Sequence, residues 1–180
     1  MSLTLFATYL FSMMVALTPL SQHAFYEKND VTASRYEVIS MTMARVIGGE
    51  TMPDGERLKV GAVMVSIGDA ESHWNAAVVS CEKGGDNDRA WGPWQTQLPK
   101  AKVCESTEAA FKLALTMVKT SFLACKELAL ADRLSWYTDG KCRHNWKRSS
   151  WRMNRALAWV KAHPFTTNVT SFNTVAVEVQ

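Results

Sequence analysis

An acidic residue stands at the inner end of the most apolar stretch of this sequence. Glu71 follows Ile67 by four positions, so a helix places its carboxyl on the same face as an apolar stripe. Burial disfavours the charged form of a carboxyl and raises its pKa. A carboxylic acid that keeps its proton near neutral pH can protonate a glycosidic oxygen. Glu71 is therefore the candidate general acid, and a solvated helix end is the plain alternative.

Residues able to hold a sugar follow in a polar, Gly-rich loop that ends in the segment AWGPWQ. Gln95 can donate hydrogen bonds to an N-acetyl group and accept them from it. Trp91 and Trp94 offer flat apolar faces for pyranose rings, although core packing explains a Trp equally well. These residues predict a saccharide-binding loop beside Glu71.

Two further carboxylates in this loop, Asp86 and Asp88, are candidates for holding an attacking water. Hydrolysis of a glycosidic bond generally needs such a second carboxylate. A solvated loop or a bound cation is the alternative for both. The sequence has no CxxC or HExxH spacing, so we expect no zinc site, and nothing in it calls for a cofactor.

Three segments, taken in order, resemble the lysozyme-like lytic transglycosylases, a superfamily that includes the goose-type lysozymes. ESHW carries the Glu-Ser pair of that family, AWGPWQ its small-x-G-x-x-Q segment, and SWYTDG its Tyr-containing segment. The likeness extends over about residues 38–164 and is closest to small phage or environmental bacterial members. The chain departs from the family where Pro93-Trp94 stand before Gln95, in place of the usual Leu-Met, and where Thr138-Asp139 replace Asn-Ala.

The resemblance implies cleavage of the β-1,4 bond between N-acetylmuramic acid and N-acetylglucosamine in peptidoglycan. Glu71 would be the acid and then the base, and the product would carry a 1,6-anhydro ring. The implied substrate-binding residues are Ser72, Gly92, Gln95, Tyr137, Trp91 and Trp94. Two alternatives stay open: a hydrolytic goose-type lysozyme that uses Asp86 or Asp88, and a non-catalytic glycan-binding or structural virion protein on the same fold.

Helical patterns dominate the elements that must position these residues. Residues 32–49 place Tyr36, Ile39 and Met43 on one face after a Thr32 or Ser34 cap. Further helices are predicted over 52–74, 105–127, 131–140 and 149–163. The expected fold is mostly α and lysozyme-like, with a central buried helix and a small β-hairpin or loop region around residues 91–97.

The N-terminal segment, residues 1–24, is apolar and uncharged from Leu3 to Leu20. It resembles the apolar region of an export signal but lacks the basic residues that usually precede one. The alternative is an uncleaved segment that packs on the domain or contacts a membrane. We expect the catalytic domain over residues 25–165 and a C-terminal tail over 166–180.

Composition is normal for a soluble globular domain, and the N-terminal segment and the cysteines predict export. Hydrophobic residues make up 47% of the 180 residues and charged ones 21%, with a net charge of +3. No basic run predicts nucleic-acid binding. The resemblance implies peptidoglycan strands as the partner, in the periplasm, in the cell wall or on a virion. The even number of cysteines predicts two disulfides. A helix over 105–127 separates Cys104 from Cys125 by roughly 30 Å, which leaves two pairings: Cys81–Cys104 with Cys125–Cys142, or Cys81–Cys125 with Cys104–Cys142.

Overall fold

Helices form nearly all the regular structure of this chain. The computed structural model describes residues 1–165, and within them there are eight α-helices, two 3₁₀ turns and no β-strand. The helices are α1 (Leu3–Leu17), α2 (Asn29–Gly48), α3 (Asp54–Ser72), α4 (Ala76–Val79), α5 (Lys100–Val103), α6 (Thr107–Ala124), α7 (Ser135–Asp139) and α8 (Lys147–Ala162). The mostly α-helical prediction is confirmed, whereas the predicted tail, residues 166–180, lies outside the described residues.

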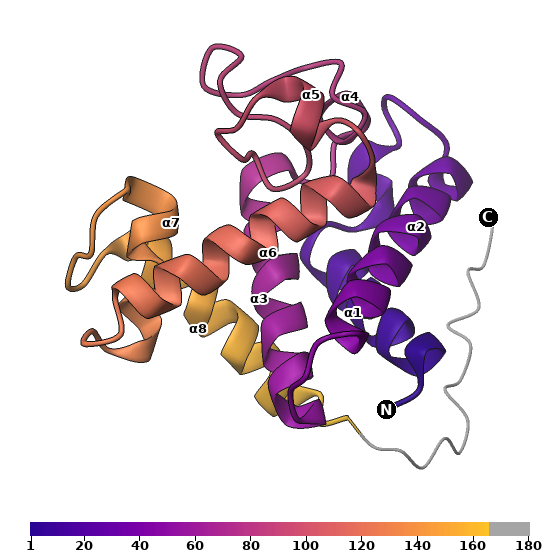
Figure 1. Cartoon of the computed structure of the whole chain (residues 1–180). Helices are drawn as coiled ribbons and strands as arrows, with labels where there is room; N and C mark the ends of the chain where they lie inside the picture. Colours follow the sequence, from indigo (N-terminus) through magenta and orange to yellow (C-terminus); the bar gives the residue numbers. More distant parts are fainter. Residues whose placement is uncertain (166–180) are drawn as a thin grey trace.

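Helix α3 is the central element. It runs between α8 on one side and α1 and α2 on the other, and it contacts all three (Figure 1). Its small residues allow this approach: a Cβ at Gly61 would come within 2.7 Å of the Leu10 side chain. The consequence is a helix whose second half is buried on almost every side, as its apolar sequence predicted.

The apolar N-terminal segment forms α1, which belongs to the core. Phe6, Leu10, Met13 and Met14 are fully or almost fully buried, and α1 packs on α2 and α3. No helix among residues 1–165 is long and apolar enough to cross a bilayer. A role of this segment as an export signal stays a prediction.

Two predicted helix starts are wrong by a few residues. Helix α2 begins at Asn29, so Thr32 lies inside it and donates its hydroxyl to Glu27 Oε1 at 2.8 Å. Helix α8 begins at Lys147, and Ser149 donates to the Ala131 carbonyl at 2.9 Å instead of capping the helix. In both cases the hydroxyl that was expected to cap donates to an acceptor that lies before the helix.

Residues 75–104 form a loop region over the C-terminal end of α3, at the top of Figure 1, and carry α4 and α5. The predicted hairpin is reduced to two isolated antiparallel bridges, Gly85–Ala90 and Trp91–Thr96. Disulfides join Cys81 to Cys104 and Cys125 to Cys142, the first of the two pairings left open by the sequence. The first bridge closes the loop that carries Gln95.

Candidate functional site

The end of α3 is fixed by a tight left-handed turn. His73 and Trp74 both have positive φ values, 46° and 56°. Ser72 donates its hydroxyl to the Gly68 carbonyl at 2.9 Å and accepts from the Trp74 amide at 3.1 Å. The Trp74 ring folds back onto Gly68, where a Cβ would meet it at 2.2 Å. Ser72, a predicted substrate-binding residue, is thus used in the turn that ends the helix and holds Glu71 in place.

Glu71 faces helix α8. Its side chain is only 25% exposed, and Arg152 Nη2 donates to Oε1 at 2.5 Å. Burial raises the pKa of the Glu71 carboxyl above its ordinary value, although the positive charges of Arg152 and Arg148 counteract part of this rise. The sequence-based prediction of a raised pKa at this carboxyl therefore has a physical basis in the fold.

Tyr137 lies close enough to Glu71 for the charge of the Glu71 carboxylate to act on its hydroxyl. Its hydroxyl donates to the Trp94 carbonyl at 2.7 Å, and its backbone amide donates to Ser121 Oγ at 3.0 Å. Burial, and then the negative charge of Glu71, raise the pKa of Tyr137, so the phenol keeps its proton. The structure thus brings Tyr137 to Glu71 from α7, 66 residues later in the chain.

Gln95 is held inside the loop. It has a positive φ of 46°, and its Nε2 donates to the Gly92 carbonyl at 2.9 Å. Its Oε1 lies where a Cβ on Gly85 would stand, 1.9 Å from that position, so only glycine fits there. Gly92 itself adopts a φ of 70° against Val103. These contacts make a compact loop that fixes the direction of the Gln95 amide.

The two loop tryptophans differ sharply in exposure. Trp94 is 1% exposed, donates Nε1 to the Met64 carbonyl at 3.0 Å and packs on Trp74 and Phe111. It is therefore a core residue here, and its ring offers no face to a sugar. Trp91 is partly exposed, and Lys100 Nζ lies 4.2 Å from its ring centre.

Trp91 lines an open groove of about 540 Å³. Asp88 lines the same groove, which is formed by residues on both sides of the Trp91–Thr96 bridge. Aromatic side chains together with a few polar groups are typical of small-molecule binding sites. The full lining is Asp88, Arg89, Trp91, Gln97, Leu98, Pro99 and Lys100.

Asp86 is held by its own loop. Its carboxylate accepts from Gln97 Nε2 at 3.2 Å and lies 3.6 Å from Arg89 Nη2. Asp86, Asn87 and Asp88 are three successive residues with positive φ. The contacts of the Asp86 carboxylate lie within the loop. Among residues 1–165 no three His, Cys, Asp or Glu side chains converge to hold a metal.

Comparisons of this chain with models of protein families, with curated proteins and with solved structures found no match.

The basic partners of α3 were missed from the sequence. Arg148, Arg152 and Arg155 recur at helical spacing on α8, which would have predicted a basic stripe on one face. Arg152 pairs with Glu71, and Arg155 pairs with Asp69 at 2.5 Å. The stripe therefore faces the two acids at the end of the central helix.

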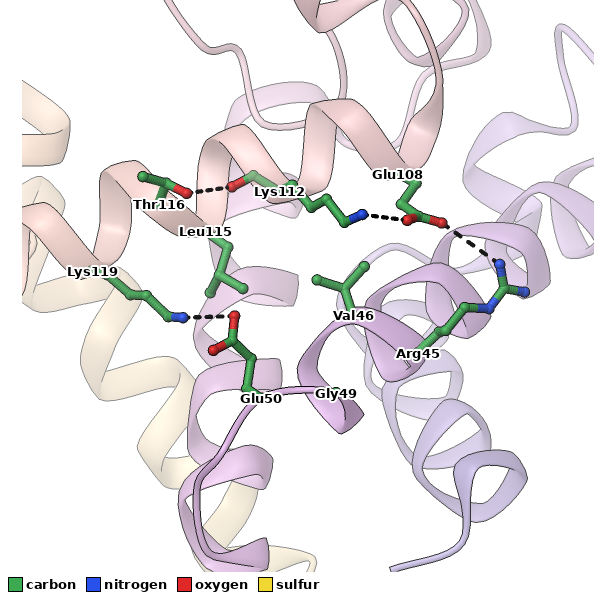
Figure 2. A pocket seen from close by; sticks show the side chains of 9 residues that line it. All are labelled: Arg45, Val46, Gly49, Glu50, Glu108, Lys112, Leu115, Thr116 and Lys119. Atoms are coloured by element: carbon green, nitrogen blue, oxygen red, sulfur yellow. Dashed lines mark hydrogen bonds and ion pairs between the residues drawn. The ribbon is translucent and has the colours of Figure 1, made fainter.

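A second pocket, of about 480 Å³, lies between α2 and α6 (Figure 2). Its acids are paired with its cations: Glu108 contacts Lys112 at 2.6 Å, and Glu50 contacts Lys119 at 2.7 Å. Lys112 holds the pKa of Glu108 below its ordinary value. A lowered pKa at Glu108 is the opposite of the shift that a general acid needs, so the Glu71 region is the better candidate.

Proposed function

We propose that this protein cleaves the glycan strands of peptidoglycan at the N-acetylmuramic acid–N-acetylglucosamine bond, with Glu71 as general acid and then general base. The observation that carries the proposal is the Glu71 carboxyl itself, half-buried at the end of the central helix with a raised pKa. Catalytic sites are where burial and charge shift a pKa in this way. The lysozyme-like fold remains part of the same proposal.

The first step breaks the glycosidic bond. Glu71 gives its proton to the bridging oxygen, and the C1–O electron pair leaves with the N-acetylglucosamine residue. The N-acetyl oxygen of the muramyl residue stabilises the positive charge at C1. Gln95 and the groove beside Trp91 would hold the sugars during this step.

The second step closes a ring. The ionised Glu71 takes the proton of the muramyl C6 hydroxyl, and the C6 oxygen bonds to C1 to give a 1,6-anhydro end. Glu71 is protonated again, and no water is consumed. Asp69, the nearest acid along α3, cannot serve as a second catalytic carboxylate, because Arg155 and Thr18 occupy it.

Hydrolysis is the second candidate, and the fixing of Asp86 by Gln97 and Arg89 favours it. An Asp held in this way could position a water on the opposite face of the sugar. The two outcomes differ in their products, because hydrolysis adds one water and ring closure does not.

We also propose that the protein acts outside the cytosol, in the periplasm, in the cell wall or on a virion. Two disulfides within residues 1–165 fit an oxidising compartment. The substrate named above is found there as well.

The test of the function is digestion of purified cell walls by wild-type protein, Glu71→Gln and Glu82→Gln. Glu71→Gln should lose at least about 10²-fold in activity, because it keeps the shape but not the transferable proton. Its melting temperature should stay close to wild type, since the Gln oxygen can still accept from Arg152. Glu82 is an exposed loop acid, so its variant is the matched control and should be fully active. Activity of the Glu71→Gln form equal to that of wild-type protein would exclude Glu71 as the acid.

A further inference from the structure

Arg152 is a buried cation with hydrogen-bonding capacity to spare. Its side chain is 9% exposed, and among residues 1–165 its one side-chain partner is Glu71, bound through Nη2. Its Nε and Nη1 are buried and have no partner in that part of the chain. Unpaired buried donors cost free energy, so each one needs an explanation.

Arg155 shows that helix packing alone does not explain this. It lies three residues further along the same helix and faces the same α3, yet all three of its nitrogens are bonded. Nε donates to Ser66 Oγ at 3.0 Å, Nη2 to the Ser66 carbonyl at 2.6 Å, and Nη1 to Asp69 at 2.5 Å. All three nitrogens of a guanidinium can thus find hydrogen-bond acceptors between these helices, whereas two of the three nitrogens of Arg152 do not.

The contact of Arg152 also divides the Glu71 carboxyl into two unlike oxygens. Oε1 accepts from Arg152, whereas Oε2 accepts no hydrogen bond from the described residues. Arg152 donates to Oε1, and the unprotonated oxygen of a carboxyl is the better acceptor, so this contact favours a neutral carboxyl that carries its proton on Oε2.

We propose that Arg152 is the positioning residue of this site: it holds Oε1 of Glu71 so that Oε2 carries the proton, and its charge sets the pH at which that proton is lost. This inference rests on the proposed function. The other charged or titratable groups that face Glu71 are Arg148 on α8 and Tyr137 on α7, while Asp69 on α3 is occupied by Arg155. Arg152 alone among them binds Glu71 directly.

The sign of the pH effect follows from the charge. A guanidinium beside a carboxyl favours the carboxylate, so removing it raises the pKa of Glu71. A general acid works in its protonated form, and activity falls as pH rises through that pKa. Without Arg152, the fall should come at higher pH.

The experiment measures wall digestion against pH for wild type, Arg152→Met, Arg152→Lys and Arg148→Met. The alkaline limb should move up by about one pH unit or more in Arg152→Met, as expected for loss of an adjacent opposite charge. In Arg152→Lys the alkaline limb should return close to its wild-type position, because Arg152 contacts Glu71 through a single donor, which a lysine can replace. Arg148 is exposed and makes no hydrogen bond to Glu71 in the described part, so its variant should shift the limb less.

A titration of the Glu71 side-chain carboxyl carbon by NMR, identified by its loss in Glu71→Gln, gives a readout that needs no activity. The Glu71 pKa should be higher in Arg152→Met than in wild type and near wild type in Arg152→Lys. If Arg152→Met does not fold, Arg152→Gln takes its place. Unchanged titration in the uncharged variant overturns the inference. If wild-type protein digests no wall, the proposed function fails, and this titration alone decides whether Arg152 controls Glu71.

Discussion

Two acid–arginine pairs join α3 to α8, and they are built differently. In the first, Asp69 is 4% exposed and accepts from Arg155 and from the Thr18 hydroxyl, so that it ties α1, α3 and α8 together. In the second, two residues further along α3, Glu71 is 25% exposed and its one side-chain partner in the described residues is Arg152. The Asp69–Arg155 pair has its hydrogen bonds satisfied, and the Glu71–Arg152 pair does not.

This difference is the basis for assigning the Asp69–Arg155 pair to the framework and for proposing the Glu71–Arg152 pair as the site. A buried ion pair stabilises a fold when further hydrogen bonds satisfy both partners. The Asp69–Arg155 pair meets that condition, whereas the Glu71–Arg152 pair leaves two guanidinium nitrogens unbonded. Burial and neighbouring charge both act on the pKa of Glu71, as they do on catalytic acids, and this supports the proposal that the Glu71–Arg152 pair belongs to a catalytic site.

The largest effect should come from breaking the framework pair. Arg155→Met should lower the free energy of unfolding by about 3–5 kcal/mol, because it leaves the Asp69 carboxylate buried without its cation. Arg152→Met should cost about 1 kcal/mol or less, since it removes two unsatisfied donors and leaves an acid that can take up a proton. Urea unfolding at neutral pH measures both free energies of unfolding. Equal losses of stability in the two variants would contradict the distinction between the Asp69–Arg155 pair and the Glu71–Arg152 pair.

The next effect concerns the loop over the site. Replacing both Cys81 and Cys104 by Ser should cost about 2–4 kcal/mol, because the bridge closes a 23-residue separation. The Cys125–Cys142 bridge, with a separation of 17, is the matched control. Its loss should cost about as much stability but less activity, because it encloses Tyr137 and not Gln95, and Glu71 keeps its contact with Arg152. Equal losses of activity in the two variants would contradict the larger role expected for the Gln95 loop.

The smallest effect is expected at Tyr137. Tyr137→Phe removes the hydrogen bond to the Trp94 carbonyl and should cost about 1 kcal/mol of stability. Activity should fall modestly, because Glu71 keeps Arg152 as its anchor. Thermal melting and wall digestion check the two parts, and a loss of activity as large as that of Glu71→Gln would make Tyr137 a catalytic residue.

The sequence predicted the elements better than their contacts. Periodicity placed the apolar face of α2, with Tyr36, Ile39 and Met43 fully buried, and it placed Glu71 at the end of a buried helix. These features follow from the spacing of apolar residues within a short stretch of sequence, so they can be predicted without knowledge of distant contacts. Gly140, the last residue of the helix predicted over 131–140, has the positive φ with which α7 ends.

What the sequence did not predict depends on contacts distant along the chain. Arg152 meets Glu71 across 81 residues, and no local pattern specifies that partner. The burial of Trp94 follows from its contacts with Trp74 and Phe111, which lie on separate elements. The hairpin fails to extend because Gln95 and Gly92 turn left-handed beside the Trp91–Thr96 bridge.

The most direct test of the central claim is the mass of the muropeptides released from purified walls by wild-type protein, with Glu71→Gln as the blank. The account predicts disaccharide-peptides with a 1,6-anhydro end, lighter than hydrolysed ones by one water, about 18 Da, and none above background from the variant. If the wild-type protein released only the heavier, reducing muropeptides, ring closure would be contradicted. That result would point to hydrolysis by a water held by Asp86. No release by wild-type protein above the Glu71→Gln blank would contradict the assignment of Glu71 as the acid of a peptidoglycan-cleaving enzyme.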